Sequence, residues 1–300
     1  MFDIFKDIFS TGFLLRHALD ATLVLGATAP VAGCFLLLRR ATFLGVALPQ
    51  VSAAGMACGM VAVAHTGMQG HGAPAVAEHG GGAAGLAGAA LAVAAALAVL
   101  AWLERRSGTG AADARHGALY ALAGATMTLV LVADPCTEHG FTSLLSGDLV
   151  SVGRGEFAMS AGVLVPAAVA LLLFRREFLG AGADGAFMAA AGWRVGRWNA
   201  LLLALVGALV CSAMHLAGPL VCLGAMLLPA LSARALAWSM GAFFLLAPLL
   251  GVVGAFAGFV VAYWQDFPAG VTIVAMHGVV LAAAGVVSLL RRRSTTATAR

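Results

Sequence analysis

The sequence has few charged residues. Only 10% of its 300 residues are Asp, Glu, Lys or Arg, whereas 62% are hydrophobic. Soluble domains carry roughly a quarter charged residues, so this shortage excludes an ordinary water-soluble domain and indicates a lipid environment. A membrane-spanning helix needs about 20 mostly apolar residues. The chain therefore predicts an all-α, polytopic membrane helix bundle with about nine transmembrane helices.

The sequence also lacks the short motifs of several enzyme classes. It has no G-x-x-x-x-G-K-[ST] phosphate-binding loop and no H-E-x-x-H zinc motif, so neither ATP hydrolysis nor metal-dependent proteolysis is expected of this chain. Its five cysteines form no C-x-x-C pair, which leaves packing as their default role. We expect a protein that is not an enzyme, with no catalytic residues and no cofactor bound by the chain.

Apolar runs separated by polar breaks place the expected spans. They cover residues 13–38, 42–65, 83–103, 117–133, 157–174, 199–215, 217–233, 237–263 and 270–290. We expect an interfacial helix at 1–12, a single transmembrane domain at 13–292 and a cytoplasmic tail at 293–300. His215, Gly218 and Pro219 interrupt one long apolar run. They predict either a helix break that lines a transport route or a tight turn at the outer surface.

Basic residues set the expected orientation, because lysine and arginine gather in the cytoplasmic loops of membrane proteins. With Arg39 and Arg40 placed inside, 14 of the 17 lysines and arginines fall on the same side. The exceptions are Lys6, Arg16 and Arg154. The pattern predicts an odd number of spans, with the N-terminus outside and the C-terminus inside. It also explains the net charge of +4 without a nucleic-acid partner.

Three segments of the second half share the order and spacing of a known family. They read SLLSGDLVSVGRGEF (143–157), LAGPLVCLGAMLLPALSARAL (216–236) and DFPAGVTIV (266–274). In these segments the chain resembles the permeases of zinc/manganese/iron-type ABC transporters. Asp266, Pro268 and Gly270 match the family's D-x-P-x-G motif, which the resemblance places at the outer face, before the last helix.

The resemblance implies a function and a set of partners. It implies a homodimeric permease subunit of an importer in the bacterial cytoplasmic (inner) membrane, which translocates zinc, manganese or iron. The expected partners are a separate ATP-binding ABC subunit, an extracytoplasmic metal-binding protein, a second copy of the chain and membrane lipid.

Residues 176–199 form the long connection that the topology places in the cytoplasm. The family carries F-D-x-x-x-A-x-x-x-G at this place, in the coupling helix that docks on the ATPase, and Asp184 and Gly192 are similar to that pattern. Phe187 would supply an apolar contact and Arg194 a charge beside it. The alternative is a plain amphipathic loop that lies on lipid headgroups.

The first half of the chain departs from the family at two positions. The segment GCFLLLRRATFLGVALPQVSAAGMACG (33–59) resembles a family stretch whose aspartate and histidine are expected to meet the metal. Val46 and Gln50 stand at those two positions. Valine cannot coordinate a cation and glutamine offers only a neutral carbonyl, so a divalent ion has no charged ligand here.

Other metal-ligating side chains occur in two regions. His65, His71 and His79 lie in a glycine-rich stretch at 65–82 that the topology places outside, where it either collects borderline metals or is simply a soluble loop. Cys211 and His215 are four residues apart, one turn of a helix, and their soft ligands suit copper(I) or zinc. The alternative role for Cys211 is packing.

Ionisable residues within the apolar runs leave a further alternative open. Asp20 could replace the aspartate missing at position 46, or it could reach the interface from its place near the outer end. With His17 and His277 it could instead form a proton relay in an ion-coupled secondary transporter. A third reading keeps the permease fold but replaces the bare ion with a chelated metal or another solute.

Overall fold

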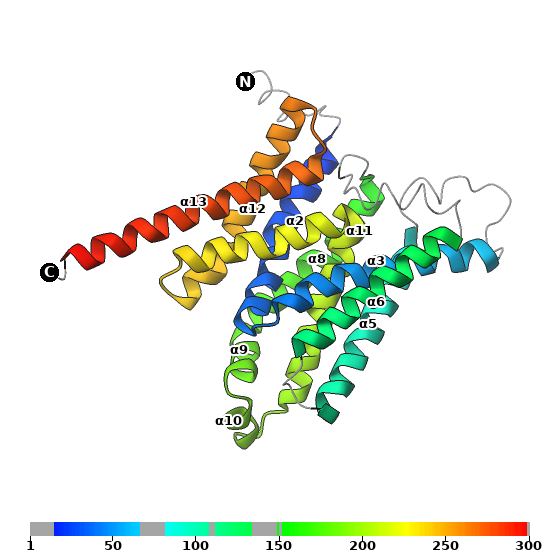
Figure 1. Ribbon diagram of the computed structural model, residues 1–300, viewed down its shortest axis with the longest axis horizontal. Helices are drawn as coiled ribbons and strands as arrows, with labels where there is room; N and C mark the ends of the chain where they lie inside the picture. Colours follow the sequence, from blue (N-terminus) through cyan, green and yellow to red (C-terminus); the bar gives the residue numbers. More distant parts are fainter. Residues whose placement is uncertain (1–14, 67–81, 108–111, 134–148, 150–151, 299–300) are drawn as a thin grey trace.

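The computed structural model describes residues 15–66, 82–107, 112–133, 149 and 152–298, and the regular elements of this part are all helices (Figure 1). They are α2 (Arg16–Leu38), α3 (Thr42–Thr66), α5 (Gly82–Ser107), α6 (Ala112–Ala133), α8 (Arg154–Leu173), α9 (Arg175–Ala183), α10 (Gly185–Ala190), α11 (Val195–Leu236), α12 (Met240–Gln265) and α13 (Ala269–Thr298). The all-α prediction is confirmed for these residues. The interfacial helix expected at 1–12 lies outside them.

Seven helices in the described part are long and apolar enough to cross a membrane. They cover Arg16–Leu38, Thr42–Ala62, Ala84–Leu103, Arg154–Leu173, Val195–Leu236, Met240–Gln265 and Ala269–Arg291. By length and composition, these helices indicate a multi-pass membrane protein. The count of nine spans stays a prediction, because α6 covers the expected span at 117–133 without being one of the seven, and α11 runs through two expected spans. The orientation of the termini also stays a prediction.

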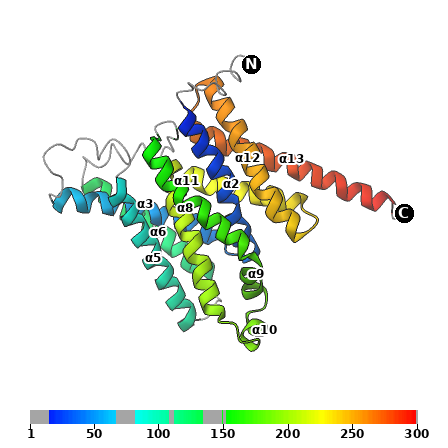
Figure 2. The same ribbon diagram turned by 180° about the vertical axis from the view of Figure 1, so that it is seen from behind.

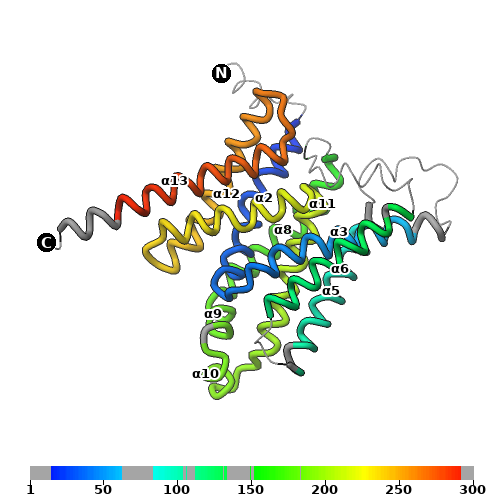
Figure 3. Tube along the Cα trace, viewed as in Figure 1, coloured from blue at the N-terminus to red at the C-terminus, as the bar shows by residue number. Residues whose placement is uncertain are grey.

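Helix α11 is broken near its middle. It runs for 42 residues, which at about 1.5 Å per residue is roughly twice the thickness of the hydrocarbon core. Gly218 has φ 73° and ψ 171° and separates two helical halves, which point in different directions in Figure 3. This region of backbone space is almost exclusive to glycine, so the break predicted around His215 and Pro219 is confirmed at Gly218.

Small residues let the helices approach closely. A Cβ atom placed on Gly55 of α3 would lie only 2.5 Å from the carbonyl oxygen of Gly88 on α5, so a larger side chain at this crossing would push the two backbones apart. Lipid offers no hydrophobic drive for helices to associate, and close backbone packing supplies much of the attraction instead.

Helix α2 lies in the centre of the bundle, against α8, α11 and α12 (Figure 2). Helices α3, α5 and α6 form a neighbouring group in which α3 contacts both others. Short helices α9 and α10 lie at one end of the bundle, away from the start of α2 (Figure 1). Helix α11 therefore packs against α3 and α8 in the interior, whereas α9 and α10 form one end of the bundle.

Candidate functional site

Val46 and Gln50, which stand where the family carries its aspartate and histidine, lie on α3, and Gln50 contacts α6. Val46 and Gln50 are four residues apart, on the same side of α3, and both are half-buried. The side-chain amide of Gln50 lies 3.5 Å from the sulfur of Met127 on α6, and a thioether is only a weak acceptor. The structure therefore shows a contact between two uncharged side chains where the family resemblance implies metal ligands.

His215 lies in the interior of the bundle with no hydrogen-bond partner. Its side chain is only 5% exposed, and both ring nitrogens are buried without a partner. One turn earlier on α11, Cys211 is 4% exposed and lies beside the Ser52 hydroxyl of α3. Cys211 thus faces α3, and His215 follows it by one turn on α11, a helix that packs against both α3 and α8.

Asp20 and His17 lie on α2 and are half-buried. The His17 ring stacks on Phe157 of α8, with 6.4 Å between the ring centroids, and its Nδ1 is buried without a partner. Across the described ranges, no three His, Cys, Asp or Glu side chains are close enough to hold a metal ion together. A role for Asp20 in place of the aspartate missing at position 46 stays a prediction.

The predicted metal-collecting stretch is mostly outside the described residues. His65 lies near the end of α3 (Thr42–Thr66), and His71 and His79 belong to the part of the chain that is not described. A metal-collecting role for the three histidines therefore stays a prediction.

His277 has a structural role that accounts for its burial. It is fully buried on α13, with Nδ1 2.8 Å from the carbonyl oxygen of Ile273 and Nε2 3.1 Å from the carbonyl oxygen of Gly251 on α12. The ring therefore joins α12 to α13. The motif that includes Asp266, Pro268 and Gly270 makes the turn between the same two helices: Asp266 ends α12 with φ 53°, and α13 starts at Ala269.

The predicted coupling segment forms two short helices, α9 and α10. The Asp184 side chain caps α10, because its Oδ1 accepts a hydrogen bond from the backbone N–H of Phe187 at 2.9 Å. Phe187 is 69% exposed and Trp193 is 43% exposed, so aromatic side chains project from this end of the bundle. Gly192 has φ 83° and turns the chain after α10. Arg194 is exposed just before α11.

A buried aromatic cluster connects α9 to the membrane helices. Phe178 of α9 packs edge-on against Phe35 of α2 at 5.8 Å and against Trp198 of α11 at 5.8 Å. Phe35 in turn lies 5.0 Å from Phe244 of α12, measured between ring centroids. Helix α9 is also held by Arg39, whose Nη2 donates a hydrogen bond to the carbonyl oxygen of Phe178 at 3.0 Å. Burial lowers the pKa of the Arg39 guanidinium.

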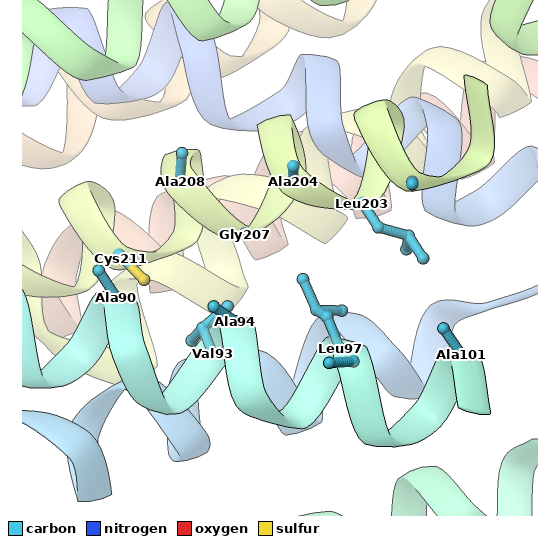
Figure 4. A pocket seen from close by; sticks show the side chains of 12 residues that line it. Ala90, Val93, Ala94, Leu97, Ala101, Leu203, Ala204, Gly207, Ala208 and Cys211 are labelled. Carbon is cyan, nitrogen blue, oxygen red and sulfur yellow. The ribbon is translucent and has the colours of Figure 1, made fainter. Parts of the chain in front are cut away.

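An apolar cavity of 370 Å³ lies between α5 and α11 (Figure 4). It is lined mainly by alanines, with Gly207 and Cys211 on α11 and Val93 and Leu97 on α5. No ionisable group other than the Cys211 thiol lines it. The cavity therefore offers no charged ligand for a cation.

Sequence reasoning missed three residues that the structure singles out. Glu156 is a lone acid at the start of a span, and its Oε2 accepts a hydrogen bond from the backbone N–H of Gly153 at 3.1 Å. Ser160 follows one turn later and is fully buried, with no hydrogen-bond partner for its Oγ. Arg39 is one of many basic residues at helix ends. A carboxylate at the start of an apolar run was a usable signal for Glu156. For Ser160 and Arg39 the sequence contains no such signal, because their importance depends on which helices they face.

The bundle of long apolar helices has the architecture of a polytopic membrane protein. The profile of the ABC 3 transport family matches residues 12–288. The chain belongs to this family.

Solved structures share the fold. The chain is similar to PsaBC from Streptococcus pneumoniae in complex with Fab, with a TM-score of 0.76, 21% sequence identity and 95% of each chain covered. It is also similar to an ABC transporter assigned to the metal-chelate type, in an inward-facing conformation, with a TM-score of 0.68, 14% identity, and 91% of this chain and 85% of that chain covered. None of the curated proteins matches the chain.

Membership in the family gives the chain its general role. It is the membrane-spanning permease subunit of an ABC transporter, and a separate chain hydrolyses ATP. In such a machine, the permease alternates between conformations, and the partner's ATP supplies the difference in free energy between them.

Proposed function

We propose that this chain is the permease of an importer for a divalent transition-metal ion: zinc, manganese or iron. The family match over residues 12–288 carries the proposal, together with the resemblance to zinc/manganese/iron-type permeases in the segments 143–157, 216–236 and 266–274. The chain would act as a homodimer in the bacterial inner membrane, and an extracytoplasmic binding protein would deliver the metal.

The surface of α9 and α10 is the proposed contact with the ATPase. Its exposed Phe187 and Trp193 would be buried by a partner, and exposed aromatic side chains of this kind are common at the centre of protein interfaces. The aromatic cluster around Phe178 and the hydrogen bond from Arg39 would then transmit movement of α9 to α2 and α12.

A second candidate keeps the same fold and carries a chelated metal. The neutral contact of Gln50 with Met127 favours it, because Val46 and Gln50 provide no charge for a bare divalent ion. An ion gradient is not the expected energy source for a member of an ABC family, so the proton-relay alternative is not carried further.

Metal-dependent ATPase activity tests the proposed function. The chain is purified with its candidate ATPase subunit, reconstituted in lipid, and assayed with zinc, manganese, iron and copper, with and without the binding protein. We expect one metal to stimulate ATP hydrolysis and to accumulate in the vesicles. A permease that copurifies with no ATPase and responds to no metal would contradict the proposal.

Restoring the family's two ligands separates the two candidates. The double variant Val46→Asp with Gln50→His places a carboxylate and an imidazole one turn apart on α3. If the substrate is a bare divalent ion, the metal concentration that gives half-maximal uptake should fall by about tenfold. Even the loss of a residue that only supports a metal ligand changes metal affinity by about that factor. For a chelated metal, the variant gains no affinity.

A further inference from the structure

A polar pocket of 450 Å³ lies among helix ends, where α2 turns into α3 and where α6 and α11 begin. Its lining includes four basic or amide side chains: Arg39, Arg40, His116 and Asn199. Asp113 is the only acid among the described residues that line it, so positive charge predominates in the pocket. Arginines at the ends of transmembrane helices lie at the depth of the lipid headgroups.

The two guanidinium groups of this pocket are suited to a phosphate. Arginine has five N–H donors, and Arg39 gives one of them, from Nη2, to the carbonyl oxygen of Phe178 at 3.0 Å. Arg40 follows directly and is exposed. Guanidinium groups bind phosphate oxygens with paired N–H donors. Asn199 adds an acceptor, because its buried Oδ1 has no hydrogen-bond partner. The pocket therefore offers cationic donors for a phosphate and an acceptor for a hydroxyl group attached to that phosphate.

The apolar cavity between α5 and α11 is continuous with this pocket. Leu97, Ala101 and Leu203 line both spaces, and they lie at one end of the cavity in Figure 4, with Ala90 and Cys211 at the other. Between Ala101 and Ala90, α5 rises by about 17 Å at 1.5 Å per residue, which is about half the thickness of the hydrocarbon core. The cavity is therefore as deep as one leaflet of a bilayer, and only one of its ends is polar.

The cavity is also accessible from outside the bundle. Five alanines that line it are exposed: Ala90, Ala94, Ala98, Ala200 and Ala204. An exposed surface between two membrane-spanning helices meets the acyl chains of the bilayer, so a chain can enter sideways without crossing the protein. The positive pocket at one end distinguishes this surface from a plain apolar face, because it fits an occupant with an anionic head and an apolar tail.

We propose that the two spaces together bind one anionic phospholipid, with its phosphate at Arg39 and Arg40 and an acyl chain between α5 and α11. Basic pockets between transmembrane helices on the cytoplasmic side bind anionic headgroups, and the expected topology assigns both arginines to that side. Volumes of 370 and 450 Å³ are of the size of ligand pockets. Ala181 and Gly182 of α9 also line the headgroup pocket. The site goes beyond the proposed function, because its ligand is a lipid and not the transported metal.

Lipid binding to the purified full chain tests the site. The chain is freed of lipid in detergent, and native mass spectrometry measures its binding of phosphatidylglycerol and of phosphatidylcholine with the same acyl chains. Glycerol phosphate, which has no acyl chain, is added as a competitor.

Two variants address the two ends of the site. Arg40→Gln removes a charge from the headgroup pocket and keeps the hydrogen bond of Arg39. Ala94→Phe fills the apolar cavity from an exposed position. The matched controls are Arg234→Gln and Ala95→Phe, because both residues are exposed and neither lines either space.

We expect one phosphatidylglycerol per chain to bind more tightly than phosphatidylcholine. Arg40→Gln should weaken phosphatidylglycerol binding by about fivefold, the contribution of one basic residue near anionic lipid, and should leave phosphatidylcholine binding nearly unchanged. Ala94→Phe should weaken both lipids by about tenfold, because that factor corresponds to the loss of two buried methylenes. Both controls should keep the wild-type affinity. Size-exclusion chromatography confirms the folding and the oligomeric state of each variant.

Several outcomes would overturn the inference. Equal affinity of the wild type for the two lipids would do so, as would unchanged phosphatidylglycerol binding in either Arg40→Gln or Ala94→Phe. Glycerol phosphate that competes as strongly as the lipid would indicate a site for free phosphate instead. An altered oligomeric state in Ala94→Phe with unchanged lipid affinity would mean that a second copy of the chain covers the cavity. Metal transport is measured separately, so none of these results decides the proposed function.

Discussion

Two buried histidines of this permease, His277 and His215, differ in what surrounds them. The His277 ring contacts two backbone carbonyl oxygens and joins α12 to α13, so its burial is compensated by local contacts. The His215 ring has no partner on either nitrogen. The same residue type therefore serves structure in one helix and remains available for a ligand in another, and only the neighbouring side chains distinguish the two cases.

The backbone at Gly218 gives a test at the residue scale. Gly218→Ala places a side chain at φ 73° and ψ 171°, and strain of this kind costs about 1–3 kcal/mol. We expect a lower unfolding temperature in detergent and reduced transport. Gly162→Ala is the control, because a Cβ at Gly162 meets nothing within 4 Å. Equal stability of Gly218→Ala and wild type would show that the break is not needed.

At the scale of the helices, α9 is packed against the membrane-spanning helices. Phe178 is fully buried among aromatic side chains of other helices, and its carbonyl oxygen accepts a hydrogen bond from Arg39 in the turn between α2 and α3. By contrast, α10 is a six-residue helix with no buried residue. The segment is therefore anchored at α9 and exposed at α10, as a surface that transmits a partner's motion requires.

Removing the Arg39 hydrogen bond should weaken this transmission. In Arg39→Gln the guanidinium donor to the Phe178 carbonyl oxygen is lost, and we expect fewer metal ions transported per ATP hydrolysed, while ATPase binding persists. Arg234→Gln removes an equal charge from an exposed position at the end of α11 and should leave the ratio unchanged. A normal ratio in Arg39→Gln would mean that this contact does not connect the ATPase to the pathway.

On the scale of the whole molecule, basic residues gather at one set of helix ends. Arg39, Arg176, Arg194 and Arg234 all lie at or near helix ends, and the positive-inside rule assigns such ends to the cytoplasm. The α9–α10 surface is on the same side in this topology. The expected position of the ATPase and the distribution of charge therefore agree with each other.

Reporter fusions test the orientation. A reporter that is active only in the cytoplasm should function when fused after Arg300, and a reporter active only outside should function when inserted within residues 71–80. This result follows from an odd number of spans with the N-terminus outside. If the reporters instead place Arg300 and residues 71–80 on the same side of the membrane, an even number of crossings separates them. That result would contradict the topology.

Much of the fold was predictable from single segments of the chain. Backbone groups in lipid must form their hydrogen bonds within their own segment, because no water is available there. An apolar run of about 20 residues is therefore expected to form a helix. The break at Gly218 was predictable for a similar reason, since glycine followed by proline disfavours a continuous helix. The cap at Asp184 and the close turn at Asp266 also depend on local chemistry. Each of these features involves residues near one another in sequence.

The sequence by itself determined the membrane class, the helices, the family and the departures at Val46 and Gln50, because composition, periodicity and motif spacing are properties of the chain. The tertiary structure decided which polar residues have partners. It left both ring nitrogens of His215 without a hydrogen-bond partner, placed those of His277 against carbonyl oxygens, and joined Arg39 to Phe178. The physical reason is that the burial and hydrogen bonding of a side chain depend on the helices packed around it, which no local pattern specifies.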